Sequence, residues 1–418
     1  SLDPSINNSP KAKINVKSSA LIFIIFLVSI SNIFFIGSAV EIKKLNKDVI
    51  PKINKLIEDE NYFDAFFAVN DTSLLAEHFP GFLDKFSSIR KISSEPKGAD
   101  VYLSKNTLKS SREIYLGETP LDGVRLPIGA VRLKFSKEGF EDRTILTKFR
   151  WTAPFIPPNL NKLNSAPVVK IDSLTKSLQI AGIIENKSKF IPDYEIDENE
   201  ITNRDYSVFL QSPAYNDQVF WNNLIKKYKL KGFSYRAVSK FIDLTGQKGP
   251  STWSVGKYGE GKATFPVLGI SWFEALAFCE FNNKTLPNIY QWDNAAGMAS
   301  SNEIIPLSNI LKKDPIDISS PTAVGVYGLK NMAGNAREWI FNSSGSKSKF
   351  LLGGGYSDEI YLFNWVQSAD PLDRSDLNGC RCAKSTNNDI AIGYEEIQRS
   401  TKDISKLVPV DDKTYQLY

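Results

Sequence analysis

The sequence predicts an α+β chain in which a transmembrane helix, a helical stalk and a small antiparallel β domain precede a larger domain with little regular structure. Three observations lead to this prediction: an uncharged apolar run near the start, a change from helical to alternating apolar periodicity near residue 91, and a concentration of tryptophan after residue 220. With 418 residues, the chain is long enough for about two or three domains. Its 42% hydrophobic and 23% charged residues are typical of a folded protein.

The charge and the histidine count exclude several classes of function. Lys+Arg 51 against Asp+Glu 47 gives a net charge of only +4, so we expect no nucleic-acid partner. The chain has one histidine, His78, whereas catalytic zinc sites and two-histidine iron sites need several imidazoles, so neither zinc nor iron is expected. A catalytic triad would have to use His78; the alternative is a histidine at the surface or at a helix end.

Residues 18–40 form the apolar run near the start. They read SSALIFIIFLVSISNIFFIGSAV and contain no charged residue. As a helix, about 23 residues would rise roughly 34 Å, which is enough to cross the hydrocarbon core of a membrane. We therefore predict a transmembrane helix; the alternative is a cleaved secretory signal, because Gly37-Ser38-Ala39 resembles a cleavage site. Three lysines lie near each end, so charge does not decide the orientation.

The segments on either side of this run are predicted to be a linker and a stalk. Residues 1–17 are polar and rich in Asn, Ser, Pro and Lys, as in a tail or interdomain linker, so we expect the chain to be a piece of a longer protein. Residues 41–90 show helical spacing of apolar side chains, first around Ile53 and then around Phe66, with a break at Asp59 to Asn61. This pattern predicts a helical hairpin.

Residues 91–147 show alternating apolar residues and frequent Gly and Pro turns, which predict a small antiparallel β domain. Four pieces follow one another in order: PKGA at 96–99, GETP at 117–120, LPIG at 126–129 and GF at 139–140. Together they resemble the PEGA domain, a resemblance that implies a spacer or binding role. Residues 148–167, rich in Pro and Asn, are predicted to link it to the larger domain at 168–390, and residues 391–418 to form a C-terminal tail.

The larger domain holds six of the seven tryptophans, which predicts a core of large aromatic side chains under irregular loops. Two helices are predicted. Ser271 is the N-cap of the first, at 272–281, with Trp272, Leu276 and Cys279 on one face. The second opens at Pro287-Asn288 and ends at Gly297, with Ile289, Trp292 and Ala296 facing inward.

Six sequence blocks of this domain occur in a characteristic order. They are EITNRDY at 200–206, PVLGISWFEA at 266–275, LPNIYQW at 286–292, YGLKNMAGNAREW at 327–339, GGG at 353–355 and GCRC at 379–382. Together they resemble the signature blocks of the formylglycine-generating enzyme, or sulfatase-modifying factor, family. The resemblance implies that family's variant of the C-type lectin fold.

Membership of this family would imply an oxidase that converts a sulfatase cysteine to formylglycine with two copper-binding cysteines. Asp358 and Phe363 stand at those two positions, Gly355 at the position of the family's serine, and Arg337 at that of a tryptophan. Copper(I) prefers soft thiolate ligands, so we expect no copper and no oxidase chemistry. These four residues nevertheless mark the candidate pocket. The related iron-dependent sulfoxide synthases need several histidines, which the chain lacks.

The resemblance also implies a structural calcium site in the fourth block. The matching ligands would be the side-chain oxygen of Asn331, the backbone carbonyls of Gly334 and Ala336, and the carboxylate of Glu338. Such oxygen ligands on a tight loop suit Ca²⁺. The alternative is that Asn331 and Glu338 only cap local turns.

A disulfide between Cys279 and Cys382 is likewise implied by the resemblance. It would close a loop of about a hundred residues and place the domain in an oxidising compartment. Cys380 would be left without a partner. The alternative is three buried, reduced thiols in a cytoplasmic protein.

A closer resemblance concerns residues 243–253, 308–309 and 370–379. These segments are similar to sulfatase-modifying-factor-like domains fused behind bacterial serine/threonine kinases, which implies a kinase domain before residue 1; the 418 residues themselves contain no kinase motif. We therefore expect a single-pass bacterial membrane protein with its bulk in the periplasm.

Three functions follow as hypotheses. The first is a binding, sensory or assembly module for a protein, peptide or glycan. The second is an enzyme of the same superfamily with a site that needs no cysteine, using Asp358, Glu359 and Asp373 as acids or bases. The third is a structural subunit of an envelope assembly.

Overall fold

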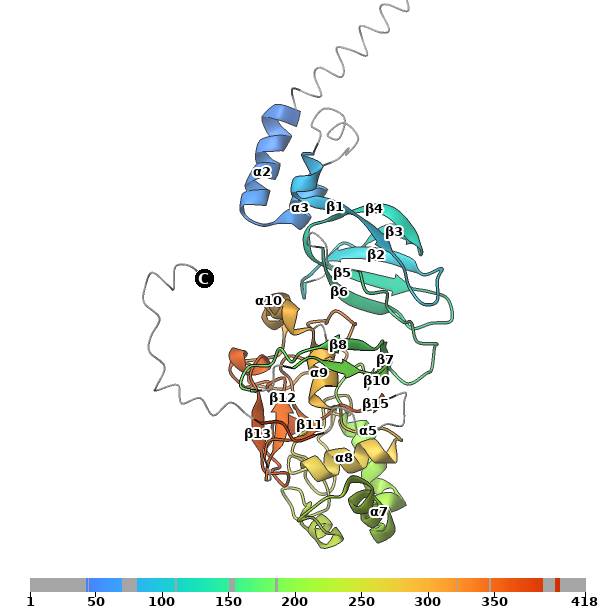
Figure 1. The fold of residues 1–418 in the computed structure, drawn as a ribbon, viewed down its shortest axis with the longest axis vertical. Helices are drawn as coiled ribbons and strands as arrows, with labels where there is room; N and C mark the ends of the chain where they lie inside the picture. The colour runs from blue at the N-terminus through green and yellow to red at the C-terminus, as the bar shows by residue number, and fades with distance from the viewer. Residues whose placement is uncertain are drawn as a thin grey trace, which may run out of the picture. The chain divides into compact units, whose positions relative to one another are not determined.

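The computed structural model describes residues 43, 45–69, 81–109, 111–149, 155–184, 187–320, 322–345, 347–385 and 395–398 (Figure 1). They fall into two compact units, 1–88 with 125–128 and 89–124 with 129–418. The predicted transmembrane window at 18–40 and His78 lie outside the described residues. Among the residues that are described, no helix has the length and apolar character needed to cross a membrane.

The first unit contains a short helical hairpin. Helices α2 (Ile50–Glu58) and α3 (Tyr62–Phe67) are separated by the turn that the sequence predicts at Asp59 to Asn61, and the Asn61 side chain caps α3 by accepting a hydrogen bond from the Asp64 N–H. A π-helical turn, η1 (Leu45–Val49), precedes α2, and η2 (Leu83–Lys85) is a short 3-10 helix. Ile53 and Ala65 are fully buried in the small apolar cluster of this unit.

The second unit contains the predicted antiparallel sheet, in the order β3-β2-β5-β6. Its strands are β2 (Asp100–Lys105), β3 (Ile114–Glu118), β5 (Gly129–Ser136) and β6 (Arg143–Phe149); β1 (Ser87–Ile92) and β4 (Leu121–Pro127) form a separate two-stranded sheet. Alternate side chains of β2 and β5 are buried, so one face of the sheet is apolar and the other polar. Strand β6 runs two residues into the predicted linker, and buried Leu160 packs the linker itself into the fold.

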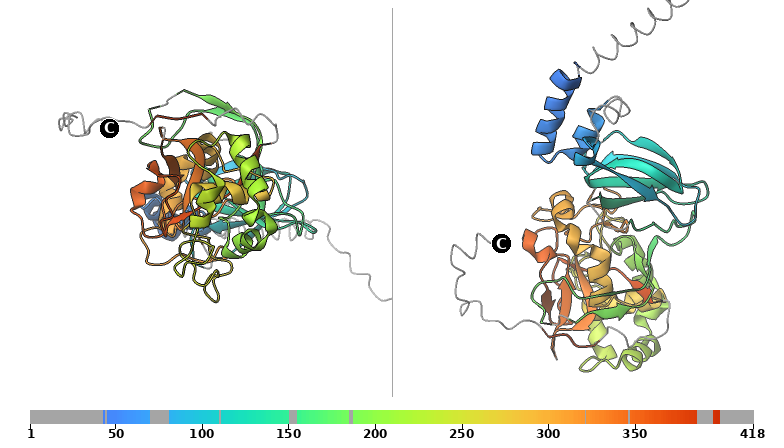
Figure 2. Two further views of the ribbon diagram at one scale, coloured as in Figure 1. Left: turned by 90° about the horizontal axis from the view of Figure 1, so that it is seen from below. Right: turned by 45° about the horizontal axis from the view of Figure 1, so that its top comes forward.

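The described residues of the larger domain form three small sheets. Loops join its strands and helices, as Figure 2 shows. One sheet has the order β15-β10-β7, the second pairs β8 with β9, and the third has the order β13-β12-β11-β14, in which β14 runs parallel to β11. The strands are β7 (Val168–Ile171), β8 (Leu174–Lys176), β9 (Lys189–Ile191), β10 (Tyr194–Asp197), β11 (Arg337–Ser343), β12 (Lys349–Leu352), β13 (Gln367–Ala369), β14 (Asn378–Gly379) and β15 (Ala383–Ser385).

Short helices pack around these sheets. They are α5 (Asn203–Gln211), α6 (Pro213–Asn216), α7 (Gln218–Tyr228), η3 (Tyr235–Lys240), α8 (Trp272–Phe281), α9 (Ile289–Ala296), η4 (Met298–Ser300), α10 (Ser301–Ile304), η5 (Ile305–Leu307) and η6 (Ile360–Phe363). Helices α5 and α7 pack against α8, as Figure 1 shows. This mixture of helices and antiparallel strands confirms the predicted α+β class.

Both predicted helices of this domain are confirmed, and each begins with a capping box. The side chains of Ser271 and Glu274 cap α8, those of Asn288 and Gln291 cap α9, and Gly297 ends α9 in the left-handed conformation. Trp272, Leu276 and Cys279 are buried as expected, and the burial extends beyond their face of α8 to all residues from Trp272 to Cys279. Four tryptophans are among the fully buried side chains of the domain, which confirms the predicted aromatic core: Trp221, Trp272, Trp292 and Trp339.

Candidate functional site

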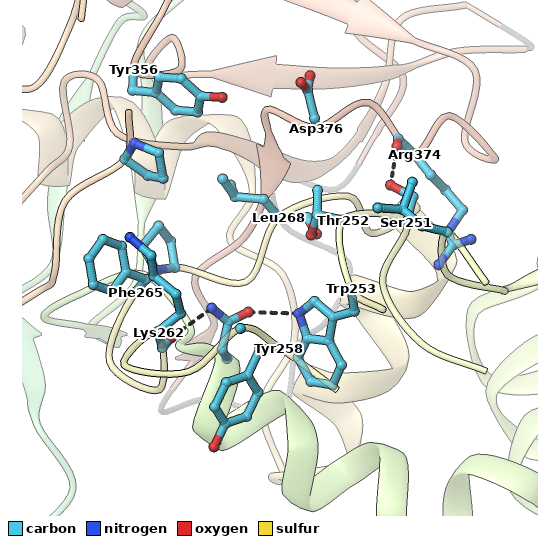
Figure 3. Close-up of a pocket in the computed structure, with 15 residues that line it drawn as sticks. Ser251, Thr252, Trp253, Tyr258, Lys262, Phe265, Leu268, Tyr356, Arg374 and Asp376 are labelled. Atoms are coloured by element: carbon cyan, nitrogen blue, oxygen red, sulfur yellow. Dashed lines mark hydrogen bonds between the residues drawn. The ribbon is translucent and has the colours of Figure 1, made fainter. Parts of the chain in front are cut away.

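A cleft in the larger domain has a volume of about 620 Å³ (Figure 3). One wall comes from the loop between η3 and α8, which contributes Trp253, Tyr258 and Lys262, and the other contains Tyr356 and Asp376. Figure 3 shows Tyr356 and Asp376 across the cleft from Tyr258 and Lys262. The remaining lining residues are Asn203, Leu244, Ser251, Thr252, Gly259, Phe265, Pro266, Leu268, Pro315 and Arg374.

Side-chain hydrogen bonds fix the loop that forms the first wall. The Asp243 carboxylate accepts hydrogen bonds from the backbone N–H groups of Thr245, Gln247 and Gly256, and thereby joins two distant parts of the loop. Deeper in the cleft, Trp253 Nε1 donates to Asn203 Oδ1 at 2.9 Å, and Asn203 Nδ2 donates to the Lys262 carbonyl at 2.8 Å (Figure 3). An irregular loop is therefore held in one shape without secondary structure.

Arg374 ties the second wall to the core. Its Nε donates to the fully buried carboxylate of Glu274 at 2.9 Å, and its other nitrogens donate to the carbonyls of Ile242 and Gly249. Burial raises the pKa of Glu274, whereas Arg374 and Ser271 oppose that rise. Because its nitrogens hold these partners, Arg374 shapes the cleft rather than offering a charge to a ligand.

Four groups in the cleft remain suited to a ligand. The carboxylate of Asp376 is exposed, and the Lys262 ammonium lies 3.8 Å from the Phe265 ring centroid. Burial raises the pKa of Tyr356, and Asp376 contributes to that rise, so the Tyr356 hydroxyl keeps its proton and can donate a hydrogen bond. Tyr258 adds an aromatic face beside Trp253, with ring centroids 5.3 Å apart. The cleft thus combines aromatic surfaces with one carboxylate and one ammonium group.

The four residues predicted to mark the pocket lie outside this lining. Arg337 donates two hydrogen bonds to the Asp358 carboxylate, and the Gly355 N–H donates a third at 2.7 Å. Phe363 is fully buried in the core, with its ring centroid 6.4 Å from that of Trp292. The structure therefore joins Arg337, Gly355 and Asp358 in one polar cluster and assigns Phe363 to the core.

This geometry makes Asp358 a poor general base. Burial acts to raise the pKa of Asp358, but the hydrogen bonds from Arg337 and Gly355 outweigh it and hold the pKa below its ordinary value. An ionised carboxylate that is already paired is a weak base. Glu359 is exposed, and Asp373 accepts a hydrogen bond from Asn378.

The residues of the predicted calcium site belong to a buried network. Glu338 accepts hydrogen bonds from the guanidinium of Arg381 and from Trp292 Nε1, and all three side chains are fully buried. Asn331 accepts from the Thr322 hydroxyl at 2.6 Å and donates to Glu200 at 3.1 Å. Among the described residues, no cluster of three or more His, Cys, Asp or Glu side chains is arranged for a metal ion.

The charges of this network are unbalanced. Burial raises the pKa of Glu200 to about 7, Glu338 adds to the rise, and Arg381 opposes it. Two carboxylates therefore face one guanidinium. The donor set of amide, carbonyl and carboxylate oxygens fits calcium in kind, and the additional carboxylate supplies a favourable charge. Because Asn331 and Glu338 already hold protein partners that calcium would displace, the calcium site stays a prediction.

The structure joins Cys279 and Cys382 in a disulfide, 103 residues apart in the sequence. Cys380 is a free, fully buried thiol. Burial raises its pKa well above the ordinary value, and the charges of Glu338 and Asp197 add to the rise. The reactive thiolate form of Cys380 is therefore strongly disfavoured.

The cleft was not predicted from the sequence, although two of the segments that line it had already been noted there. Ser251 and Arg374 belong to the segments 243–253 and 370–379 noted for their resemblance to kinase-fused domains, and the Ser251 hydroxyl donates to the Arg374 carbonyl at 2.7 Å. The two segments thus meet in space. Tyr258 and Lys262 had no comparable signal, because they lie in an irregular loop.

Two family models match parts of the chain. Residues 183–386 match the sulfatase-modifying factor enzyme 1-like domain, and residues 87–149 match the PEGA domain. Both resemblances noted in the sequence are confirmed at this level.

Individual proteins show more distant similarity. The formylglycine-generating enzyme of Mus musculus is 23% identical over 254 residues, which are 46% of this chain and 66% of that enzyme. The serine/threonine-protein kinase pkn1 of Chlamydia caviae is 23% identical over 157 residues, 36% of this chain and 23% of the kinase. The chain thus spans less than two thirds of the length of these relatives. The crystal structure of CarF aligns with 53% of this chain and 99% of its own, with 14% identity and a TM-score of 0.34.

Proposed function

We propose that this chain, which carries a sulfatase-modifying-factor-like domain behind a PEGA domain, is a binding or assembly module rather than a cysteine-dependent oxidase. The ion pair between Arg337 and Asp358 carries the proposal, because it occupies the positions at which the family resemblance puts a tryptophan and a copper-binding cysteine. The position of the second cysteine is filled by Phe363, a core side chain. The residues present do not fit a copper ion.

The remaining cysteines support the same proposal. Cys279 and Cys382 are joined to each other, and the thiol of Cys380 is buried with a raised pKa. A cysteine-based oxidase needs accessible thiolates. The three cysteines of the chain do not supply any.

The cleft supports a peptide, protein or glycan as the ligand. Its aromatic faces, at Trp253 and Tyr258, suit stacking against a sugar ring or an apolar side chain. The Asp376 carboxylate and the Tyr356 hydroxyl can fix the orientation of such a ligand by hydrogen bonds. Within the described residues, the Asp376 carboxylate takes part in no ion pair, so it is available to a ligand.

A membrane anchor and a position outside the cytoplasm are part of the proposal. The apolar window at 18–40 supports the anchor, and a disulfide of this kind persists in oxidising compartments such as the periplasm. The similarity to a chlamydial protein named as a kinase supports a kinase domain before residue 1. Fractionation of cells that make the chain with and without residues 18–40 tests the anchor: the shortened chain should leave the membrane fraction.

Screening of peptide and glycan arrays tests the binding function. The purified chain is compared with Tyr356→Ala, which removes a cleft side chain, and with the control Tyr361→Ala, which removes a tyrosine exposed elsewhere. We expect ligands whose binding weakens about tenfold in Tyr356→Ala and not in Tyr361→Ala. Equal binding by both variants contradicts the assignment of the cleft, and copper-dependent formation of formylglycine on a cysteine peptide contradicts the proposed function.

A further inference from the structure

The polar face of the β3-β2-β5-β6 sheet carries a hollow of about 340 Å³, separate from the cleft of the larger domain. Strands β2, β5 and β6 and the loop after β2 line it. The strand register places Ser104 opposite Arg132, and Lys134 opposite Thr144, so these four side chains project from the same face. We call this hollow the sheet pocket.

Positive charge dominates the sheet pocket. Lys105, Lys109, Arg132 and Lys134 line it, against a single carboxylate, Glu113. Glu113 forms an ion pair with Lys134. The lining residues therefore carry four cations but only one anion, in a hollow that concentrates their field.

Arg132 is the most informative of these cations. Its Nε donates to Asn106 Oδ1 and its Nη2 to the Thr322 carbonyl, each at 3.0 Å, so both partners are neutral. No carboxylate pairs with Arg132 within the described part of the chain, and burial lowers its pKa. A guanidinium that is partly removed from water without an anion is unfavourable, and an anionic ligand would compensate it.

We propose that the sheet pocket binds a tetrahedral oxyanion, the phosphate or sulfate group of a small molecule. Phosphate and sulfate present several oxygens in different directions, which matches a site with the guanidinium of Arg132, the ammonium of Lys109 and the hydroxyls of Ser104 and Thr144 on different strands and loops. The hollow exceeds the size of one such ion, so it also has room for the organic part of the ligand. This binding site is independent of the cleft and of the function proposed for it.

Calorimetric titration of the purified 418-residue chain tests this proposal. Inorganic phosphate, inorganic sulfate and acetate are titrated separately at constant ionic strength set with sodium chloride. We expect saturable binding of phosphate or sulfate, with acetate at least about tenfold weaker because it has a single charge and two oxygens. Whichever of phosphate and sulfate binds more tightly shows which of the two groups the ligand carries. Binding no stronger than that of acetate for both ions overturns the proposal.

Three variants locate the site. Arg132→Gln should weaken binding about tenfold and Lys109→Gln about threefold, because each removes a charged donor. Lys91→Gln removes an exposed lysine of the same domain outside the pocket and should leave binding unchanged. If Arg132→Gln does not fold, Lys109→Gln tests the site instead, because Lys109 is exposed and its replacement should not disturb the fold. Equal binding by Lys109→Gln and Lys91→Gln overturns the proposal.

Discussion

Arg337 and Asp358 form a two-pronged ion pair, with Nε 2.6 Å from Oδ2 and Nη2 2.5 Å from Oδ1. The Asp358 side chain is 8% exposed and that of Arg337 21%, so the pair is largely screened from water. Both residues depart from the pattern of the family that the sequence resembles, and each supplies the partner that the other needs. The two residues that differ from the family pattern therefore act together, as the two partners of one ion pair.

Removal of Arg337 should cost stability. Arg337→Met leaves the buried Asp358 carboxylate without its ion-pair partner, and we expect the free energy of unfolding to fall by about 2 kcal/mol. Asp358→Asn should cost less, about 1 kcal/mol, because the amide oxygen can still accept from Gly355. Urea denaturation measures both values. The control, Arg236→Met, changes an exposed arginine and should have no effect; an equally small effect of Arg337→Met would show that the pair contributes nothing.

The disulfide should contribute substantially to stability. Cys279→Ser with Cys382→Ser opens a loop of 103 residues, and chain entropy predicts a loss of roughly 4 to 5 kcal/mol. Thermal unfolding without reductant measures this loss. A thiol count should find one reactive group in the unfolded wild-type chain and none in the native chain, because Cys380 is buried. Three reactive thiols on unfolding would contradict the disulfide.

Glu200 should make the domain less stable as the pH rises. Its pKa is about 7 in the folded chain against 4.5 as the ordinary value, so the folded state binds more protons between those values. The free energy of unfolding should therefore fall between about pH 4.5 and 7, by up to about 3 kcal/mol, and level off above pH 7. Glu200→Gln should remove this slope. Urea denaturation at several pH values measures the change of the free energy of unfolding with pH. An unchanged slope in Glu200→Gln would show that Glu200 does not cause it.

Lys349 should make the domain more stable as the pH rises above about 7. Its Nζ donates to the Phe341 carbonyl at 2.8 Å and lies 4.0 Å from the Trp272 ring centroid, and burial lowers its pKa to about 7 against an ordinary 10.5. The unfolded state then binds more protons between these values, so stability should rise from about pH 7 to 10. Lys349→Met should raise Tm by a few degrees at pH 7 and abolish the rise with pH. Lys384→Met, at an exposed lysine, should change neither.

Calcium should stabilise the buried network around Glu338. Binding to the folded state alone raises Tm, and the second carboxylate, Glu200, favours a cation there. We expect a higher Tm in millimolar calcium than in EGTA, and a smaller difference in Glu200→Gln. Magnesium at the same concentration is the control, because it prefers a smaller octahedral site. A Tm that is the same in calcium and EGTA rules the site out.

The ends of the helices could be predicted from the sequence, but the burial of their faces could not. Ser271 with Glu274, and Asn288 with Gln291, are capping boxes whose spacing is visible in the chain, so the starts of α8 and α9 were predictable. The full burial of α8 depends on Arg374, which neutralises Glu274 from 100 residues away. No local pattern reveals such a partner.

Only part of the candidate site, too, could be predicted from the sequence. Asp358 and Phe363 could be assigned from the sequence to the positions where the resemblance puts two copper-binding cysteines, because the resembling blocks fix their place in the chain. The cleft could not be predicted from the sequence, because its first wall is an irregular loop held by side-chain contacts such as that of Asp243 with Gly256. The charge state of Glu200 also required coordinates, since it arises from burial.

The disulfide between Cys279 and Cys382 encloses only one wall of the cleft. Tyr356 and Asp376 lie within the covalent loop, whereas Trp253, Tyr258 and Lys262 lie outside it. A reductant would therefore release one wall from a covalent tie while leaving the hydrogen bonds of the other untouched. Under the proposed binding function, reduction of this disulfide should therefore weaken ligand binding in the cleft, so that a ligand bound in an oxidising compartment would be bound more weakly in a reducing one.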